Sequence, residues 1–467
     1  MLSSQVERSR LSAVADTATG SPADISGRIE RLPISRWHVK ARVLIGTATF
    51  FDAFDALSIA QVLPVLVPLW KLSSSEVGFL IATGYLGQLI GALFFSAVAE
   101  RYGRVSAMVA SIATFTVMSI ACGFATNYES LLAFRALQGF GLGGEVPIAA
   151  VYISEITKAH GRGRFVLLYE LIFSVGVVAA GAIGYWVVPH LGWHYMFFIG
   201  AIPILFVRTI YRWLPESPRW LASKGRFVEA DKSLSKIEAH VEASLGQSLP
   251  KPVIAEGKFI TEKRSSWMEL FSSQYVGRTL VVWCIWFASY LIYYGISTWL
   301  PTLYHTIFKL PLELSLRYGL ISTAVGFVGA TACALSIDRV GRKAWFTLSL
   351  AGSGAFLLAL WYSGATEPKH LLIYGSGAYF FATAAAIGVY LYTPELYPTR
   401  IRALGVGTAT AWLRIASMTG PLVIGGLIKF GLNWVFLVFA GAALAVTVVV
   451  AAFAIETKER TLEELSP

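Results

Sequence analysis

The chain contains one kind of charged turn twice, as Glu100-Arg101-Tyr102-Gly103-Arg104 and as Asp338-Arg339-Val340-Gly341-Arg342-Lys343. Each copy places an acid, a glycine and at least two basic residues between two long apolar stretches. Tight turns of this kind join helices at a membrane surface. Their recurrence predicts a membrane protein built from two related halves, an arrangement that usually frames a path for a solute.

The composition also indicates a membrane protein. Hydrophobic residues make up 55% of the 467-residue chain and charged residues only 14%, against about 25% charged in a typical soluble domain. A membrane-spanning helix needs roughly 20 predominantly apolar residues. Twelve stretches qualify, near 41–70, 76–99, 105–126, 130–157, 164–189, 193–214, 277–304, 316–337, 344–363, 371–394, 402–427 and 433–455. We therefore expect an all-α integral membrane protein with 12 transmembrane helices in two pseudo-symmetric six-helix bundles.

The basic residues are distributed unevenly. The formal net charge is +10, and Lys and Arg concentrate in the two tails, the charged turns and the central loop. This positive-inside pattern predicts that both termini and the central loop are cytoplasmic, and it explains the charge without a nucleic-acid partner. Short outer loops without a glycosylation triplet favour a bacterial inner membrane. The expected partners are the lipid bilayer, a small organic substrate and protons, and the expected state is a monomer.

The change in polarity along the chain predicts its organisation. The expected parts are a flexible cytoplasmic tail at 1–38, a six-helix bundle at 39–218, a cytoplasmic linker with short helices at 219–275, a second six-helix bundle at 276–456 and a cytoplasmic tail at 457–467. Cys122, Cys284 and Cys333 lie inside predicted spans without metal-ligand spacing. Since no phosphate-binding Gly-rich loop occurs either, no metal, cofactor or ATP drive is expected.

Several motifs resemble the major facilitator superfamily of secondary transporters. The charged turn is similar to the family's pattern Gly-x-x-x-Asp-Arg-x-Gly-Arg-Lys/Arg, and the departures from it are Ser96, Glu100, Val105 and Ala334. The segments from Pro215 to Leu221 and from Pro394 to Arg400 resemble motifs of the sugar-porter and organic-ion branches. The resemblance covers almost the whole chain. It implies a secondary transporter that works by alternating access, not an enzyme.

Other residues resemble one branch of the superfamily more closely. Phe51-Asp52-Ala53-Phe54-Asp55 is similar to the double-aspartate motif of aromatic-acid/proton symporters. The stretch from Trp286 to Pro301 resembles span seven of the organic-ion and synaptic-vesicle-type branch, whose bacterial members include nicotinate transporters. The resemblance implies proton-coupled uptake of a small aromatic monocarboxylate, with nicotinate first and benzoate-like acids next.

A charge at the middle of a membrane-spanning helix costs about 2.5–3.5 kcal/mol on insertion scales, and six charged residues inside the predicted spans stand out for this reason. They are Asp52, Asp55, Arg135, Glu145, Glu170 and Arg414. A desolvated carboxyl group holds a proton more readily, and a nearby arginine opposes this. By resemblance to sugar/proton symporters, Asp55 corresponds to the proton-binding aspartate and Arg135 to its partner; the alternative is a static ion pair. Asp52 shares a helix face with Asp55, and it either joins proton coupling, faces the outer cavity or caps a neighbouring group.

Two of the intramembrane acids keep two interpretations each. Glu145 lies between Gly144 and Pro147, and it is either a buried hydrogen-bond acceptor or a further proton-coupling site. Glu170 lies in span five, where sugar porters place a substrate-binding amide. It either takes part in proton or substrate binding or packs as an ion pair with Arg135.

Arg414 gives the sharpest indication of the substrate, because a guanidinium offers a planar, permanently charged fork to a carboxylate. Organic-anion relatives carry a basic residue in this helix; the alternative is a structural pair with an acid of another helix. Trp286, Tyr290 and Tyr293 follow i, i+4, i+7 spacing on one face of span seven. They are candidates for stacking on a flat ligand, and the alternative is helix packing or an interfacial belt.

The charged turns and nearby motif residues are predicted to form a cytoplasmic gate, whose ion pairs break and re-form as the path opens and closes. Its members are Glu100, Arg101, Arg104, Glu155, Arg162, Glu216, Arg219, Asp338, Arg339, Arg342, Glu395 and Arg400. Solvated loop charges without a gating role are the alternative.

Two other functions stay open. A sugar or polyol/proton symporter should hold Gln and Asn side chains on spans five and seven, and these spans contain none. A non-transporting receptor or scaffold of the same fold is the other, and the intact gate motifs together with Asp55 and Arg135 argue against it.

Overall fold

A computed structural model describes residues 22–157, 162–250 and 267–458, without the side chains of 22–23, 162–170, 399–400 and 403. Within these ranges, 12 helices are long and apolar enough to cross a membrane. The expectation of an all-α membrane protein is thereby confirmed. The predictions for Arg162, Glu170 and Arg400 concern side chains outside the described ones and stay predictions.

The N-terminal half contains six spans, and the sixth is broken into two helices. The helices are α3 (Arg36–Trp70), α4 (Ser74–Tyr102), α5 (Arg104–Gly123), α6 (Tyr128–Ile156), α7 (Arg162–His190), α8 (His194–Gly200) and α9 (Ile204–Trp213). Glycines allow α4 and α6 to approach closely. A Cβ atom on Gly87 would collide with the main-chain oxygen of Ala136, and one on Gly139 with that of Gly84.

The C-terminal half repeats this plan. Its spans are α12 (Val276–Thr306), α13 (Leu312–Val340), α14 (Arg342–Tyr362), α15 (Pro368–His370) continued by η2 (Leu371–Gly375) and α16 (Ser376–Glu395), α17 (Thr399–Leu427) with η3 (Ile428–Phe430), and α18 (Leu432–Phe453). The charged turns occupy equivalent junctions in the two halves. Gly103 separates α4 from α5 with φ 108°, and Gly341 separates α13 from α14 with φ 94°. Because glycine adopts positive φ at little cost, it ends the helix at the same point in each copy.

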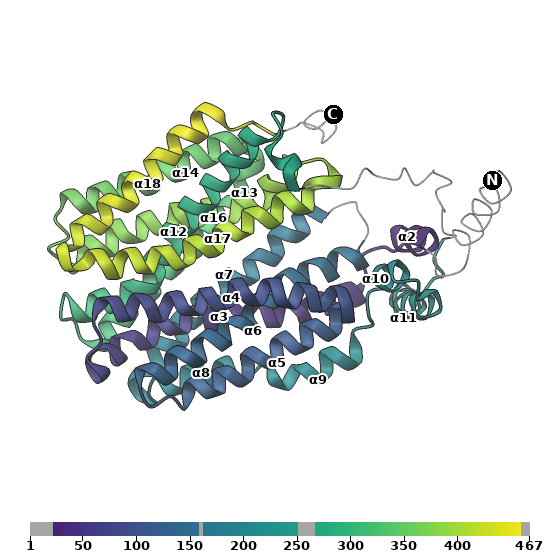
Figure 1. Ribbon diagram of the computed structural model, residues 1–467, viewed down its shortest axis with the longest axis horizontal. Coiled ribbons are helices and arrows are strands. Elements are labelled where there is room, and N and C mark those ends of the chain that lie inside the picture. The colour runs from purple at the N-terminus through teal and green to yellow at the C-terminus, as the bar shows by residue number, and fades with distance from the viewer. Residues whose placement is uncertain (1–21, 158–161, 251–266, 459–467) are drawn as a thin grey trace.

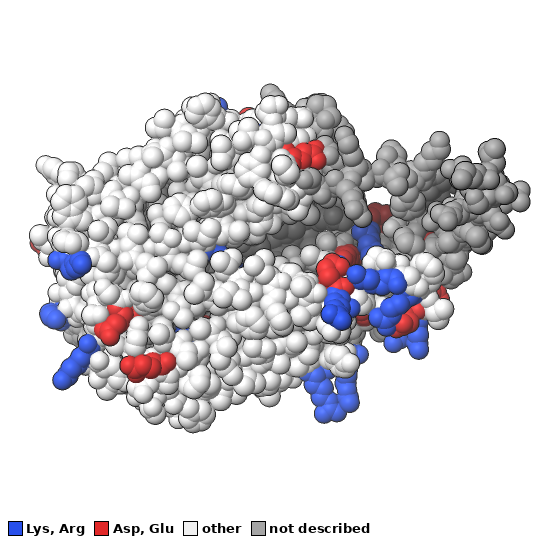
Figure 2. All heavy atoms as spheres, in the orientation of Figure 1, with Lys and Arg blue, Asp and Glu red and all other residues white. Residues whose placement is uncertain are grey.

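The two halves lie side by side and meet at one end (Figure 1). Far from α2, α10 and α11, a Cβ atom on Gly78 of α4 would lie 2.9 Å from the main-chain oxygen of Pro421 on α17. Nearer the middle, the rings of Tyr85 and Tyr294 are 4.8 Å apart across the interface. Toward the charged turns, a hollow separates the halves (Figure 2). The path is therefore closed at one end and open toward the end that carries the charged turns.

Short helices outside the membrane spans cover this open end of the N-terminal half (Figure 1). They are α2 (Pro22–Glu30), α10 (Pro218–Ser223) and α11 (Phe227–Leu245), while η1 (Trp267–Phe271) precedes α12. The expectation of a flexible N-terminal tail is wrong for α2. Ile25 and Ile29 are completely buried, because a helix places residues four apart on one face, and Arg28 contacts Glu238 of α11 at 2.7 Å.

Candidate functional site

A cavity lies between the two halves. The described side chains that line it are Thr49, Asp52, Val146, Phe173, Ser174, Tyr290, Tyr293, Tyr294, Thr383, Ala386, Ile387, Tyr390, Leu413 and Arg414. Among these described residues, only Asp52 of α3 and Arg414 of α17 are charged, and they come from opposite halves. The remaining wall is mostly aromatic and apolar, with three Ser or Thr hydroxyl groups. A cavity of this kind suits a small ligand that has a flat apolar body and a charged end.

The predicted substrate residue Arg414 reaches the cavity from α17 and also bonds across the interface. Its Nη1 donates a hydrogen bond to Oε1 of Gln88 on α4. Gln88 is only 3% exposed. The sequence does not predict this contact, because one glutamine inside a span has no pattern that points to an arginine 326 residues away. A guanidinium has five N–H donors, so this single bond leaves others for a ligand.

The aromatic candidates of α12 separate into two groups. Tyr290 and Tyr293 line the cavity, and so does Tyr294. Trp286 is completely buried, its ring stacks on Tyr290 with centroids 5.5 Å apart, and its Nε1 donates to Oγ1 of Thr393 at 2.9 Å. Trp286 is thus not among the described residues that line the cavity. Its ring instead packs against Tyr290, which does line it.

Asp55 and Arg135 lie in a separate buried cluster inside the N-terminal half. The carboxylate of Asp55 accepts hydrogen bonds from Nε2 of Gln138 at 2.5 Å and from Oγ of Ser119 at 3.2 Å. Nη1 of Arg135 donates to Oε1 of Gln138 at 2.7 Å and to the main-chain oxygen of Asp55 at 3.4 Å. Gln138 therefore bridges the two charges, and within the described ranges no ion pair joins them directly. The sequence predicts both charges as a functional pair, but it does not predict the amide between them.

Two further acids among the six intramembrane candidates are described, and their surroundings differ from those of Asp55. Asp52, one helical turn before Asp55, lines the cavity rather than the buried cluster. Glu145 is completely buried and accepts a hydrogen bond from Oγ1 of Thr49 at 3.1 Å. This bond connects α6 to α3, which agrees with the interpretation of Glu145 as a buried acceptor.

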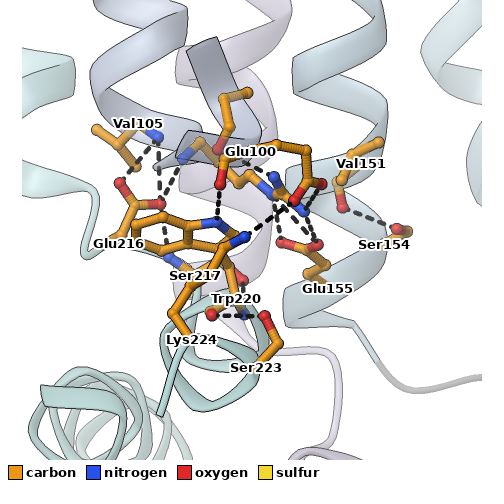
Figure 3. A network of polar contacts seen from close by, with 12 residues as sticks. Glu100, Val105, Val151, Ser154, Glu155, Glu216, Ser217, Trp220, Ser223 and Lys224 are labelled. Carbon is orange, nitrogen blue, oxygen red and sulfur yellow. Dashed lines mark hydrogen bonds and ion pairs between the residues drawn. The ribbon is translucent and has the colours of Figure 1, made fainter. Parts of the chain in front are cut away.

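The first charged turn forms a network within the N-terminal half (Figure 3). Nη2 of Arg104 lies 3.0 Å from Oε1 of Glu155 and 2.8 Å from Oε1 of Glu100. Glu216 accepts a hydrogen bond from the backbone N–H of Arg104 at 2.8 Å, which satisfies a free donor at the start of α5. Nε1 of Trp220 donates to the main-chain oxygen of Glu100 at 3.1 Å. The network therefore anchors α10 to the turn.

The second charged turn repeats this pattern with other residues. Arg342 lies 2.9 Å from Glu395 and 2.9 Å from Asp338. Glu456 accepts from the backbone N–H groups of Arg342 at 2.8 Å and Lys343 at 3.0 Å, as Glu216 does in the first half. Burial opposes ionisation of Glu456, but four backbone N–H groups outweigh it and hold its pKa below the ordinary value; they belong to Lys458, Arg342, Lys343 and Thr457. Glu456 is not among the predicted gate residues, although an acid follows the last span of each half.

The remaining described gate candidates make fewer contacts. Arg219 lies 3.4 Å from Glu30 of α2, and the guanidinium of Arg101 lies 5.4 Å from the centroid of the Tyr102 ring. The main-chain oxygen of Arg339 accepts from Nζ of Lys458. In the described part of the chain, the ion pairs of Arg104 and Arg342 stay within their own halves. The candidate gate is therefore two separate clusters on either side of the hollow.

Known proteins resemble this chain in sequence over most of their length. A family model described as "sugar (and other) transporter" matches residues 25–467. The niacin transporter NiaP of Acinetobacter baylyi is 34% identical over 95% of this chain and 99% of its own. The putative niacin/nicotinamide transporter NiaP of Bacillus subtilis is 29% identical over 91% of this chain and 98% of its own. Synaptic vesicle 2-related protein of Bos taurus is 27% identical over 95% of this chain and 82% of its own.

Solved structures agree with the fold. The xylose transporter XylE from E. coli, in a partially occluded inward-open conformation, matches with a TM-score of 0.71 at 19% identity, over 91% of this chain and 100% of that one. Twelve spans around a cavity between two halves define a multi-pass membrane transporter of small molecules, not an enzyme. The chain belongs to the sugar (and other) transporter family, within the major facilitator superfamily.

Proposed function

We propose that the protein takes up a small aromatic monocarboxylate by proton-coupled alternating access across a bacterial inner membrane, with nicotinate as the first candidate and benzoate-like acids next. The observation that carries this proposal is that Arg414, Tyr290 and Tyr293 line one cavity. An aromatic carboxylate offers a charged end to the guanidinium and a flat face to the tyrosine rings. The two niacin transporter relatives support the choice of nicotinate.

Asp55 is the proposed carrier of the coupled proton. Its carboxylate is completely buried and lies near Arg135 without an ion pair between them, because Gln138 bridges the two. In the described part of the chain, Nε of Arg135 has no hydrogen-bond acceptor. A second arrangement in which Arg135 moves nearer to Asp55 would favour loss of the proton, and this would couple protonation to the shape of the N-terminal half.

The cavity is less suited to a sugar. A site that recognises many hydroxyl groups needs several side chains that both donate and accept hydrogen bonds, as Asn and Gln do. Among the described residues that line this cavity, none is Asn or Gln. The aromatic and apolar wall instead favours a ligand with one flat hydrophobic face.

Uptake of labelled nicotinate into liposomes that contain the purified protein tests the proposal. Wild-type protein should accumulate nicotinate when an inward proton gradient is present, and Arg414→Ala should abolish uptake. Arg317→Ala is the matched control, because Arg317 is an exposed arginine of α13 outside the cavity lining. Asp55→Asn should still exchange nicotinate but should not accumulate it from a gradient.

Three results would contradict parts of this scheme. Absence of uptake beyond empty liposomes would exclude nicotinate, and labelled benzoate and sugars would then be tested in the same vesicles. Full activity of Arg414→Ala would exclude its role in substrate binding. Binding of nicotinate without flux in the wild type would indicate a receptor of the same fold.

A further inference from the structure

The contact between Gln88 and Arg414 is a direct side-chain hydrogen bond between the two halves at the cavity. The backbone at Gln88 packs closely against α6 of its own half, because a Cβ atom on Gly143 would collide with the main-chain oxygen of Gln88. Tyr85, one turn earlier on the same face of α4, packs its ring against Tyr294 of the other half. The position of Gln88 therefore follows that of the N-terminal half, whereas Arg414 moves with the C-terminal half.

The chemistry of this bond suits a temporary partner. A partly buried guanidinium without an acceptor is costly, and the amide oxygen of Gln88 supplies one acceptor for Arg414. An amide oxygen is neutral and offers a single atom, whereas a carboxylate is charged and accepts two parallel bonds from a guanidinium. A substrate carboxylate can thus replace Gln88, but it must first displace it.

The bond also depends on which end of the path is open. At the closed end, a Cβ atom on Gly425 of α17 would contact the main-chain oxygen of Ser74 at the start of α4. Opening this end requires α4 and α17 to move apart, as alternating access demands. That movement stretches the bond between Gln88 and Arg414, so the amide competes for the guanidinium in one state and not in the other.

We propose that Gln88 is a positioning residue that competes with the substrate carboxylate for Arg414 and so lowers substrate affinity in the state open toward the charged turns. The inference rests on the proposed function for the identity of the ligand. Substrate is captured while the opposite end is open, because Arg414 then lacks its amide partner. Release of the substrate toward the charged turns is favoured, because Gln88 then accepts the hydrogen bond of Arg414 again.

Membrane vesicles of both orientations allow affinity to be measured from each face. Gln88→Met keeps the volume but removes the acceptor. It should lower the half-saturating nicotinate concentration at the charged-turn face roughly tenfold, with a reduced maximum rate and no change at the opposite face. Gln88→Glu should raise that concentration at least tenfold, because a carboxylate binds the guanidinium more strongly. The matched control is Gln61→Met, since Gln61 is also buried, on α3, and does not line the cavity.

Two outcomes of the vesicle measurement would overturn the inference. Equal weakening of substrate binding at both faces by Gln88→Met would mean that Gln88 merely supports Arg414. Unchanged affinity at both faces in Gln88→Met and Gln88→Glu would mean that it only packs.

A distance measurement tests the same inference without any substrate. Spin labels on Ser75→Cys and Lys429→Cys, both exposed at the closed end, are placed in a Cys284→Ser background. Gln88→Glu should hold the labels at the short distance, and Gln88→Met should broaden the distances toward longer values. Unchanged distances in both variants would overturn the inference even if nicotinate is transported. If the wild type does not transport nicotinate but the distances shift as expected, the proposed substrate fails and the role of Gln88 is supported.

Discussion

The two charged turns share one construction and differ in what surrounds it. Arg104 and Arg342 each bond an acid on a neighbouring span, Glu155 and Glu395. In each half a further glutamate accepts from the backbone N–H groups at the start of the next helix. In the N-terminal half the chain then continues into α10 and α11, and α2 packs onto them. The C-terminal turn has no such helices among the described residues.

This difference separates what the turn itself requires from what was added to it. A helix that ends in a glycine and restarts at once leaves free N–H groups at the new N-terminus, and an acid near them is stabilising. Both halves meet this requirement in the same way. The contacts of Arg28 with Asp231 and Glu238 exist only on the N-terminal side, so they serve a separate purpose, the attachment of α2.

The largest effect should come from removing the central arginine of either turn. Arg104→Met and Arg342→Met each leave a mostly buried acid without its cation, at a cost of about 3 kcal/mol, and each should abolish transport. Unfolding in detergent and nicotinate uptake would be measured, with exposed Arg317→Met as control. The two turns would not be equivalent if one variant lost activity while the other kept it.

Removing the attachment of α2 should have a smaller effect and only in the N-terminal half. Arg28→Met removes one partner of the partly buried Glu238. This should cost about 2 kcal/mol and release α2 from α11. Faster hydrogen exchange in α2 and α11, with slow exchange kept in α14 and α18, would show this. Arg226→Met is the control, because the ion pair of Arg226 with Glu229 is exposed and does not involve α2. Protection of α2 equal to that of the wild type would contradict the prediction.

The glutamates at the helix starts should contribute less again. Glu216→Gln and Glu456→Gln keep the shape but replace a charged acceptor by a neutral one, so each should cost about 1 kcal/mol. Their effects should add in the double variant, because they lie in different halves. Chemical unfolding of the two single variants and the double variant tests this. A double variant no less stable than either single one would show that the two turns are coupled.

The smallest effect should be the pH dependence due to Glu456. Its pKa is held below the ordinary value by backbone N–H groups in spite of burial. Its contribution to stability is therefore fully present above the unfolded pKa of about 4.3 and is lost as pH falls through the lower folded pKa. The difference in melting temperature between wild type and Glu456→Gln should shrink on titration from pH 6 to pH 3. A difference that stays constant over this range would contradict the assignment.

The spans and the charged turns could be predicted because each depends on local sequence. The helices need long apolar stretches in lipid, and the turns need a glycine at positive φ. Even Glu456 could have been found by extending the repeat, since Glu216 follows the last span of the first half. Helical periodicity placed Trp286 and Tyr290 on one face, but it could not tell which of them borders the cavity, since neighbouring helices decide that.

The sequence by itself determined an all-α membrane fold of two related halves and the charged residues that the membrane would not hold without a reason. Only the tertiary structure decided which groups meet these charges: Gln88 at Arg414, Gln138 between Asp55 and Arg135. The physical reason is that a neutral amide makes no periodic or charge pattern along the chain. Its role arises only when helix packing brings it within hydrogen-bonding distance of a charge on another span or another turn.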